Sequence, residues 1–306
     1  MRQLKLGSEG YEVRKLQALL KIKVDGIYGP LTRSSVIDFQ LSRNLKPDGI
    51  VGAQTWALLI ANPGGLVEDI SQDTDVQGQY FKTNFDQIIH KHYLSKGQYV
   101  EGKRNNEYFF LHHTAGGCNP YQCIDHWDRD SRGRVATEFV LGGQDYRTGN
   151  DEYDGVMVQA FPEDGYGWHL GKTGSGYMNR HSIGLEICSI GYLNDDNYSY
   201  VGKKALDDQV ITLDKAFRNK INWHRYSFKQ IEEIDKLIRF VAERDSINVR
   251  EGLQKWIKKD GPIKAFGFQE DAYYGKVKGL LSHGNVRKDK MDVYPDPNLV
   301  DIIMSL

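Results

Sequence analysis

The sequence predicts a small all-α N-terminal domain of three helices followed by a larger α/β domain. Three observations support this prediction. Apolar residues recur at helical spacing on both sides of a repeated glycine-rich turn in the first 62 residues. Apolar runs typical of strands, separated by turn residues, follow in the segment 106–195. Beyond them, the pattern predicts an amphipathic helix over 226–242 and a further helix over 250–259.

The composition excludes several classes of protein. The chain has 306 residues, enough for two domains of about 100–200 residues each. Lys and Arg total 40 and Asp and Glu total 41, so no basic footprint for nucleic acid is present. No apolar run approaches the roughly 20 residues of a membrane helix, and the start has no apolar secretory segment. The three cysteines are too few for a disulfide scaffold: Cys118, Cys123 and Cys188. We therefore expect no nucleic-acid partner, no stable membrane insertion, no signal peptide and a monomer made in a reducing compartment.

The first domain, predicted over residues 1–62, contains an internal repeat. The segment VDGIYGPLT at 24–32 recurs as PDGIVGAQT at 47–55. The glycines of each copy can adopt positive φ without steric cost, which is typical of tight turns. Thr32 and Thr55 are placed to cap or open the next helix. We predict three short helices around a small core, joined by two glycine-rich turns.

The two parts of the chain differ in charge. Residues 1–65 carry nine basic and five acidic residues, or +4, so the remainder carries −5 to give the net charge of −1. A basic module would suit an anionic surface, although random scatter of charge explains the split equally well. Asn62, Pro63 and two glycines mark the end of the module. We predict a linker over 63–80 and a second domain over 81–306. The second domain is expected to begin with a helix near 85–92.

Four places in the second domain concentrate reactive side chains. His112 and His113 end an apolar strand, and only one of them can face a given site because neighbours on a strand point to opposite faces. Glu186 stands inside an apolar strand, where a carboxylate needs a charged partner or a chemical role. The third place is Trp168-His169 in a glycine-rich turn. The fourth is Ser282-His283, followed by Lys290 and Asp292. It lies in a segment that is predicted to have no regular structure up to residue 299.

The histidines and one carboxylate form a plausible zinc site. His112, His283 and an acid nine residues further on, Asp292, would make a three-ligand set with a fourth position open for water. Zinc lowers the pKa of bound water, a nearby Glu can accept its proton, and a nearby Lys can stabilise an oxyanion. Spacing alone leaves other sets open, since nine histidines and 41 acidic residues offer many triples.

The motifs HHTAGG, WHLG, NRHSIGLEI and the final His…Lys-x-Asp together resemble the type 2 N-acetylmuramoyl-L-alanine amidases. That family includes phage endolysins and is related to animal peptidoglycan recognition proteins. The resemblance covers roughly 106–300, with extra stretches near 195–225 and 245–280. The N-terminal repeat is similar to the peptidoglycan-binding module of cell-wall hydrolases. The resemblance implies a mixed β-sheet flanked by helices, and peptidoglycan as a polymeric substrate bound by both domains.

The resemblance also implies the metal ligands. It places zinc on His112, His283 and Asp292, where the family has two histidines and an Asp or Cys. No cysteine lies in the last loop, so the third ligand is expected to be an oxygen. Asp289 and Asp296 remain rival third ligands in the same loop.

The roles of the other site residues follow from the same resemblance. Glu186 matches the general base, and Lys290 matches the lysine that steadies the oxyanion. Trp168 and His169 are expected in the substrate groove. Glu138 stands where the family often has a histidine. Its side chain is therefore expected either near the metal, where it would contact substrate, or in solvent.

The implied function is hydrolysis of the amide between N-acetylmuramic acid and L-alanine of the stem peptide. A phage endolysin, made in the cytoplasm of an infected bacterium and acting on the cell wall, fits this description. Two alternatives stay open: a non-catalytic peptidoglycan-recognition protein, and a zinc peptidase that cuts within the stem peptide. The full ligand set with Glu186 and Lys290 disfavours the first. A histidine strand in place of a His-Glu-x-x-His helix disfavours the second.

Overall fold

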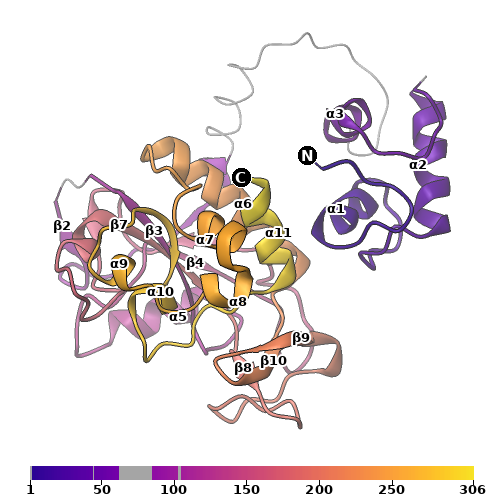
Figure 1. Ribbon diagram of the computed structural model, residues 1–306. Coiled ribbons are helices and arrows are strands. Elements are labelled where there is room, and N and C mark those ends of the chain that lie inside the picture. The colour runs from indigo at the N-terminus through magenta and orange to yellow at the C-terminus, as the bar shows by residue number, and fades with distance from the viewer. Residues whose placement is uncertain (1, 44, 62–84, 103–104) are drawn as a thin grey trace. The chain divides into compact units, whose positions relative to one another are not determined.

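The computed structural model describes residues 2–43, 45–61, 85–102 and 105–306 (Figure 1). The chain divides into two compact units, and the boundary between them falls within the undescribed residues 62–84. The predicted linker over 63–80, the breaker cluster before it and the predicted start of the second domain at residue 81 therefore lie outside the described residues.

The first unit contains three helices, as the repeat predicts. They are α1 (Tyr11–Leu19), α2 (Pro30–Ser42) and α3 (Ala53–Ala61). An isolated bridge between Leu4 and Val51 ties the start of the chain to the second turn. The apolar side chains of the three helices and the two turns close over one small core: Leu4, Val13, Leu16, Tyr28, Val36, Val51, Trp56 and Leu59.

A buried glutamine of the preceding helix holds each glycine-rich turn. Gln17 Nε2 donates to Asp25 Oδ1 (2.7 Å) and to Thr32 Oγ1 (3.0 Å), and Gln17 Oε1 accepts from the backbone N–H of Gly26 (2.8 Å). Thr32 thus opens its helix and does not cap it, since the N-cap is Gly29, which has no side-chain bond. The second copy repeats these bonds from Gln40 to Asp48 (3.1 Å), Thr55 (3.3 Å) and Gly49 (2.9 Å).

The second unit is built around a six-stranded mixed sheet, which confirms the predicted α/β class. Three strands run parallel side by side, β3 (Tyr108–His113), β7 (Ser182–Ile187) and β11 (Gly279–Ser282), and β4 (Phe139–Leu141) is parallel to β7 and antiparallel to β5 (Met157–Gln159). In spatial order the strands are β1 (His90–Lys91), β5, β4, β7, β3 and β11.

Helices flank this sheet on both faces. On one face, α5 (Pro120–Asp128) packs against Val140 of β4. On the other, α6 (Phe228–Arg244) lays Arg244 over the ring of Phe139, at 5.6 Å from its centroid. Because neighbouring strand residues point to opposite faces, these two contacts place α5 and α6 on opposite sides of the sheet.

Helix predictions in this unit are confirmed at two places and corrected at two. Ser227 accepts from the backbone N–H of Gln230 (3.0 Å) and starts α6 with a capping box. The helix predicted over 250–259 is α7 (Leu253–Asp260). The helix predicted near 85–92 ends at residue 88, because the chain then pairs with β5 as β1. The last loop is not irregular up to residue 299, since α10 (His283–Val286) starts directly after β11 and α11 (Pro297–Ser305) starts two residues earlier than predicted.

The two extra stretches form separate substructures. The first is a three-stranded antiparallel sheet with the order β8 (Tyr192–Leu193), β10 (Lys220–His224) and β9 (Val210–Phe217). The second contains α7, α8 (Pro262–Ala265) and α9 (Glu270–Tyr273). The remaining short elements are β2 (Val100–Glu101), its partner β6 (Gly165–Tyr166) and 3-10 turns at Met178–His181 and Asp207–Gln209.

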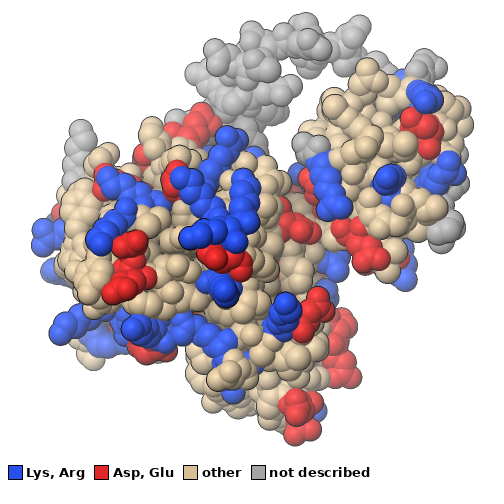
Figure 2. Space-filling model, viewed as in Figure 1, with Lys and Arg blue, Asp and Glu red and all other residues tan. Residues whose placement is uncertain are grey.

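Acidic and basic side chains are intermixed on the face drawn in Figure 2, in line with the balanced composition. No field of a single sign covers that face of the second unit. Within the described part of the chain, no helix combines the length and the apolar character needed to cross a membrane.

Candidate active site

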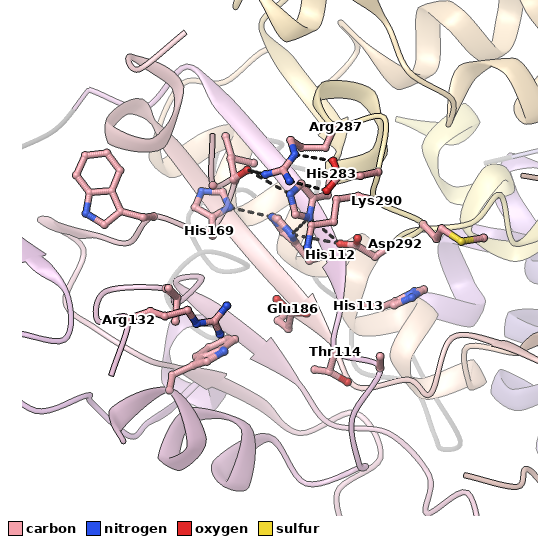
Figure 3. Close-up of a pocket in the computed structure, with 18 of the residues that line it drawn as sticks. His112, His113, Thr114, Arg132, His169, Glu186, His283, Arg287, Lys290 and Asp292 are labelled. Atoms are coloured by element: carbon pink, nitrogen blue, oxygen red, sulfur yellow. Dashed lines mark hydrogen bonds and ion pairs between the residues drawn. The ribbon is translucent and has the colours of Figure 1, made fainter. Parts of the chain in front are cut away.

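Three neighbouring parallel strands bring the reactive side chains to one edge of the sheet. His112 at the end of β3 is the register partner of Glu186 in β7, so both side chains leave the same face. Ser282 of β11 pairs with Leu111, and the next residue, His283, therefore comes level with His112. The carboxyl ends of parallel strands form a common site in open α/β sheets. Figure 3 shows the resulting cluster.

Three ligand atoms converge in this cluster. His112 Nδ1 lies 3.1 Å from His283 Nδ1, and Asp292 Oδ2 lies 2.9 Å from His283 Nδ1 and 3.5 Å from His112 Nδ1. A tetrahedral zinc with bonds of about 2.0–2.1 Å needs ligand atoms about 3.3 Å apart. The donor set and its spacing therefore fit a zinc ion. Within the described residues, these three are the group of His, Cys, Asp or Glu side chains that could hold a metal.

The two rival acids have other partners. Asp289 pairs with Arg287 at 2.6 Å, and most of its side chain is exposed. Asp296 is buried and caps α11, where Oδ1 accepts from the backbone N–H of Asn298 (2.8 Å) and Oδ2 from Tyr294 Oη (2.8 Å). Neither carboxylate reaches the histidines, which leaves Asp292 as the proposed oxygen ligand.

The outer nitrogens of both histidines are held by neighbours. His283 Nε2 donates to the carbonyl oxygen of Leu170 (3.4 Å). His112 Nε2 lies 2.8 Å from His169 Nδ1, and His169 Nε2 lies 2.8 Å from Ser182 Oγ. Partners of this kind fix the ring orientation and leave the inner nitrogen free to bind a metal. His169 therefore supports His112 as well as lining the groove.

Burial sets the charge state of the cluster. Burial, together with the nearby His283, lowers the pKa of His112 to about 4. Burial opposes ionisation of Asp292 too, but the two histidines hold the pKa of its carboxyl well below the usual range. At neutral pH the cluster thus contains neutral His112 and an ionised carboxylate, the protonation states that metal binding requires.

Glu186 and Lys290 face the same space. Glu186 is partly exposed and points into the pocket beside the cluster (Figure 3). Burial raises the pKa of Glu186 well above its usual range, Asp292 raises it further, and Lys290 lowers it. A carboxylate tuned in this way is suited to exchange protons near neutral pH. Lys290 is half-buried and lines the same groove.

The cluster lies in a groove of about 650 Å³. Trp168 and His169 line this groove, as the family resemblance implies. A second hollow of about 390 Å³ shares Thr114, Trp127 and Glu186 with the groove, so Glu186 lies between two hollows. The groove also has lining residues that sequence reasoning missed, because no motif marks them: Arg132, Val135, Tyr192, Tyr200, Arg287 and Met291.

The structure corrects one predicted position, Glu138, and bears out the separation of His113 from His112. Glu138 does not line the groove, and it does not point to solvent: its side chain is fully buried against Arg244 and Gln159. The expectation of Glu138 in contact with substrate is therefore corrected, because a buried cation holds the carboxylate elsewhere. His113 does not join the ligand cluster: its Nδ1 lies 3.3 Å from Tyr226 Oη, as the strand alternation predicts, and the residue lines another part of the groove.

A mixed sheet with two histidines and a carboxylate at its carboxyl edge, beside an acid–base carboxylate in an open groove, is typical of metal-dependent hydrolases. Family models narrow this class. The N-acetylmuramoyl-L-alanine amidase model matches residues 102–289, more than half of the chain. The peptidoglycan binding domain model matches residues 9–59. The chain therefore belongs to the N-acetylmuramoyl-L-alanine amidase family and contains an N-terminal peptidoglycan-binding module, as the motifs predicted.

Individual proteins match over shorter or more distant stretches. A curated relative from Kitasatospora aureofaciens, "Uncharacterized protein in bpoA1 3'region", is 58% identical over 36 residues, which are 12% of this chain and 30% of the relative. Among solved structures, PlyL is 15% identical to this chain, with a TM-score of 0.38. The aligned region covers 67% of this chain and 85% of the PlyL chain. A fused Zn-dependent amidase/peptidase/peptidoglycan-binding protein from Clostridium acetobutylicum is 26% identical with a TM-score of 0.20, over 37% of this chain and 51% of its own.

Proposed function

We propose that this chain hydrolyses the amide bond between N-acetylmuramic acid and the L-alanine of the stem peptide in bacterial peptidoglycan. One observation carries the proposal. In a chain of this family, His112, His283 and Asp292 converge to metal-ligand spacing in the groove that also holds Glu186. We further propose that the chain acts on the cell wall as a lysin of the phage type.

The metal expected at this site is zinc. His112 and His283 would bind it through Nδ1, and Asp292 would bind it through a carboxylate oxygen. When bound, zinc supplies Lewis acidity that polarises a carbonyl and favours ionisation of water near neutral pH. The outer-nitrogen contacts to Leu170 and His169 would keep both rings oriented for this role.

Glu186 moves the proton in the proposed reaction. Its carboxylate takes a proton from the attacking water as the water oxygen bonds to the amide carbon. As the carbon–nitrogen bond breaks, Glu186 passes the proton to the leaving nitrogen of L-alanine. The lactyl group is released as a carboxylic acid, and its proton then passes to the free amine to give a carboxylate and an ammonium group. The raised pKa of Glu186 supports both transfers, because it brings the acid and base forms closer in energy at neutral pH. Lys290 would stabilise the negative charge that develops on the carbonyl oxygen.

The N-terminal unit would hold the enzyme on its polymer. Its family match is to a peptidoglycan binding domain, and the catalytic unit acts on the same polymer in this proposal. A linked pair of sites raises the effective concentration of the second site once the first is bound. We therefore propose residues 1–62 as a wall-binding module and 81–306 as the catalytic domain.

Mass spectrometry of digested peptidoglycan tests the proposal. Purified wall is incubated with the full chain after metal removal, after zinc is restored, and with the Glu186→Gln variant carrying zinc. We expect intact stem peptides with a free L-alanine amine from the zinc-loaded wild type alone. Fragments cut within the stem would overturn the bond assignment in favour of a peptidase. Wall binding without any release would favour a recognition protein.

A further inference from the structure

The extra sheet of residues 192–224, here called the inserted sheet, contacts the segment that carries two of the three ligands. That segment, residues 283–292, is here called the ligand loop because it begins with His283 and ends with Asp292. One contact comes from the turn between β9 and β10 and reaches the loop itself, and the other comes from β10 and reaches Tyr294, two residues beyond the loop.

The first contact is made by the turn between β9 and β10. Arg218 at this turn sends Nη1 to the carbonyl oxygen of Lys288 (2.6 Å) and Nη2 to that of Gly284 (3.2 Å), with the carbonyl of Arg287 at 3.5 Å. Three backbone oxygens of the ligand loop thus converge on one guanidinium. Its planar, rigid fork is suited to binding several oxygens in a fixed geometry.

The turn is built to present this side chain. Arg218 and Asn219 have φ values of 48° and 62°, in the left-handed region that residues with a Cβ rarely adopt. Glycine would fill the first position of such a turn without strain, so the arginine is kept there at a conformational cost. The hairpin turn itself requires positive φ at both positions, and an arginine is accommodated there at a cost that its three carbonyl contacts can offset.

The second contact lies just after Asp292. The ring of Trp223 in β10 stacks on Tyr294, with centroids 4.7 Å apart and planes 16° apart. Both rings are fully buried. Tyr294 Oη also lies 3.2 Å from the carbonyl oxygen of His224. The residues flanking the ligand loop are thus packed on the inserted sheet at the end opposite to Gly284.

We propose that the inserted sheet braces the ligand loop, and that Arg218 is a positioning residue that sets the distance between His283 and Asp292. The ring of His283 and the carboxylate of Asp292 are 2.9 Å apart, and the loop between them returns on itself through a bond from Gly284 N–H to the carbonyl oxygen of Asp292 (3.2 Å). Arg218 holds the carbonyl of that same Gly284. The proposal rests on the proposed metal site and adds a residue outside the family motifs to it.

Zinc affinity of the full chain, measured by competition with a chromophoric chelator and without substrate, tests this proposal. Arg218→Ala is expected to bind Zn²⁺ about 10–100-fold more weakly, the usual effect of losing an outer support of a metal site. Arg218→Lys, which can still donate to one or two carbonyls, is expected to recover part of the loss. Lys215→Ala, an exposed change on β9 of the same sheet, is the matched control and is expected to bind like the wild type.

Hydrogen exchange provides a readout that needs no metal. Arg218→Ala is expected to speed amide exchange in residues 284–292 while β3 and β7 keep wild-type rates. If the alanine variant does not fold, Arg218→Gln takes its place in both measurements. Unchanged zinc affinity and unchanged loop exchange would overturn the brace, and so would faster exchange spread evenly over the catalytic unit. If the wild type binds no zinc, the proposed metal chemistry fails, and the exchange rates alone decide the brace.

Discussion

Arg244 Nη1 lies 2.9 Å from Glu138 Oε1 and joins the end of α6 to the residue before β4. The carboxylate is fully buried, and its Oε1 also accepts from Gln159 Nε2 at 3.1 Å. The ion pair explains how an acidic residue is accommodated within the sheet beside Phe139, whose ring lies under the same guanidinium. Glu138 is therefore assigned to stability and not to the groove.

Removing one partner of this pair is expected to destabilise the catalytic unit strongly. Arg244→Met leaves the Glu138 charge buried without its cation, which costs about 3–5 kcal/mol in typical proteins. The double variant Arg244→Met with Glu138→Gln is expected to recover part of that loss, because the fully buried charge of Glu138 is then removed while Asp245, the second acidic partner of Arg244 at 2.6 Å, still lacks its cation. Urea unfolding measures both free energies. A single variant as stable as the wild type would contradict the assignment.

The duplicated glutamines predict equal effects in the N-terminal unit. Gln17→Ala leaves the buried N–H of Gly26 without its acceptor, and Gln40→Ala does the same to Gly49. Each loss is expected to cost about 1–3 kcal/mol. Thermal unfolding of the full chain, followed together with pelleting on cell walls, measures the effect. Gln54→Ala, an exposed change in α3, is the control and is expected to stay near wild type.

The environment of Glu186 predicts the acid limb of the pH profile. A general base works only when ionised, and the pKa of Glu186 is raised well above 4.5 by burial and by Asp292. Activity is thus expected to fall as pH drops through this raised value, at higher pH than an ordinary glutamate would give. Lys290→Ala removes a charge that lowers the pKa of Glu186, so the limb should move further up in pH. Measurements of kcat/KM against pH test the direction, and a downward move would argue against Glu186 as the base.

Asp292 and Asp289 offer a matched pair for testing the third ligand. Asp292→Ala removes the carboxylate between the two histidines and is expected to abolish activity and weaken zinc binding by at least about 10-fold. Asp289→Ala breaks only a mostly exposed pair with Arg287, so its effect should be small. Wall binding through the N-terminal module should survive in both variants. Equal zinc affinities of the two variants would refute Asp292 as a ligand.

Local patterns account for what the sequence predicted correctly. The repeated turns follow from residues within each copy, and the capping box of Ser227 and Gln230 involves neighbours three residues apart. Strand alternation separated His112 from His113 because it depends on adjacent positions alone. The motifs then identified the family through short segments. These features depend on contacts within a turn of helix or along one strand, which the order of residues largely determines.

Only the tertiary structure decided which distant residues meet. His112 and His283 are separated by 171 positions and come together because β3 and β11 pair in parallel. The sequence left three positions possible for the Glu138 side chain: near the metal, in contact with substrate, or in solvent. The structure instead pairs it with Arg244, which lies 106 positions further along the chain. The contact from Arg218 to the ligand loop has no sequence signal either, since a guanidinium that binds backbone oxygens leaves no pattern in the side chains it contacts. The sequence alone determined the family, the candidate ligands and the elements marked by strong local patterns, whereas the remaining elements and the choice among rival residues depended on long-range packing.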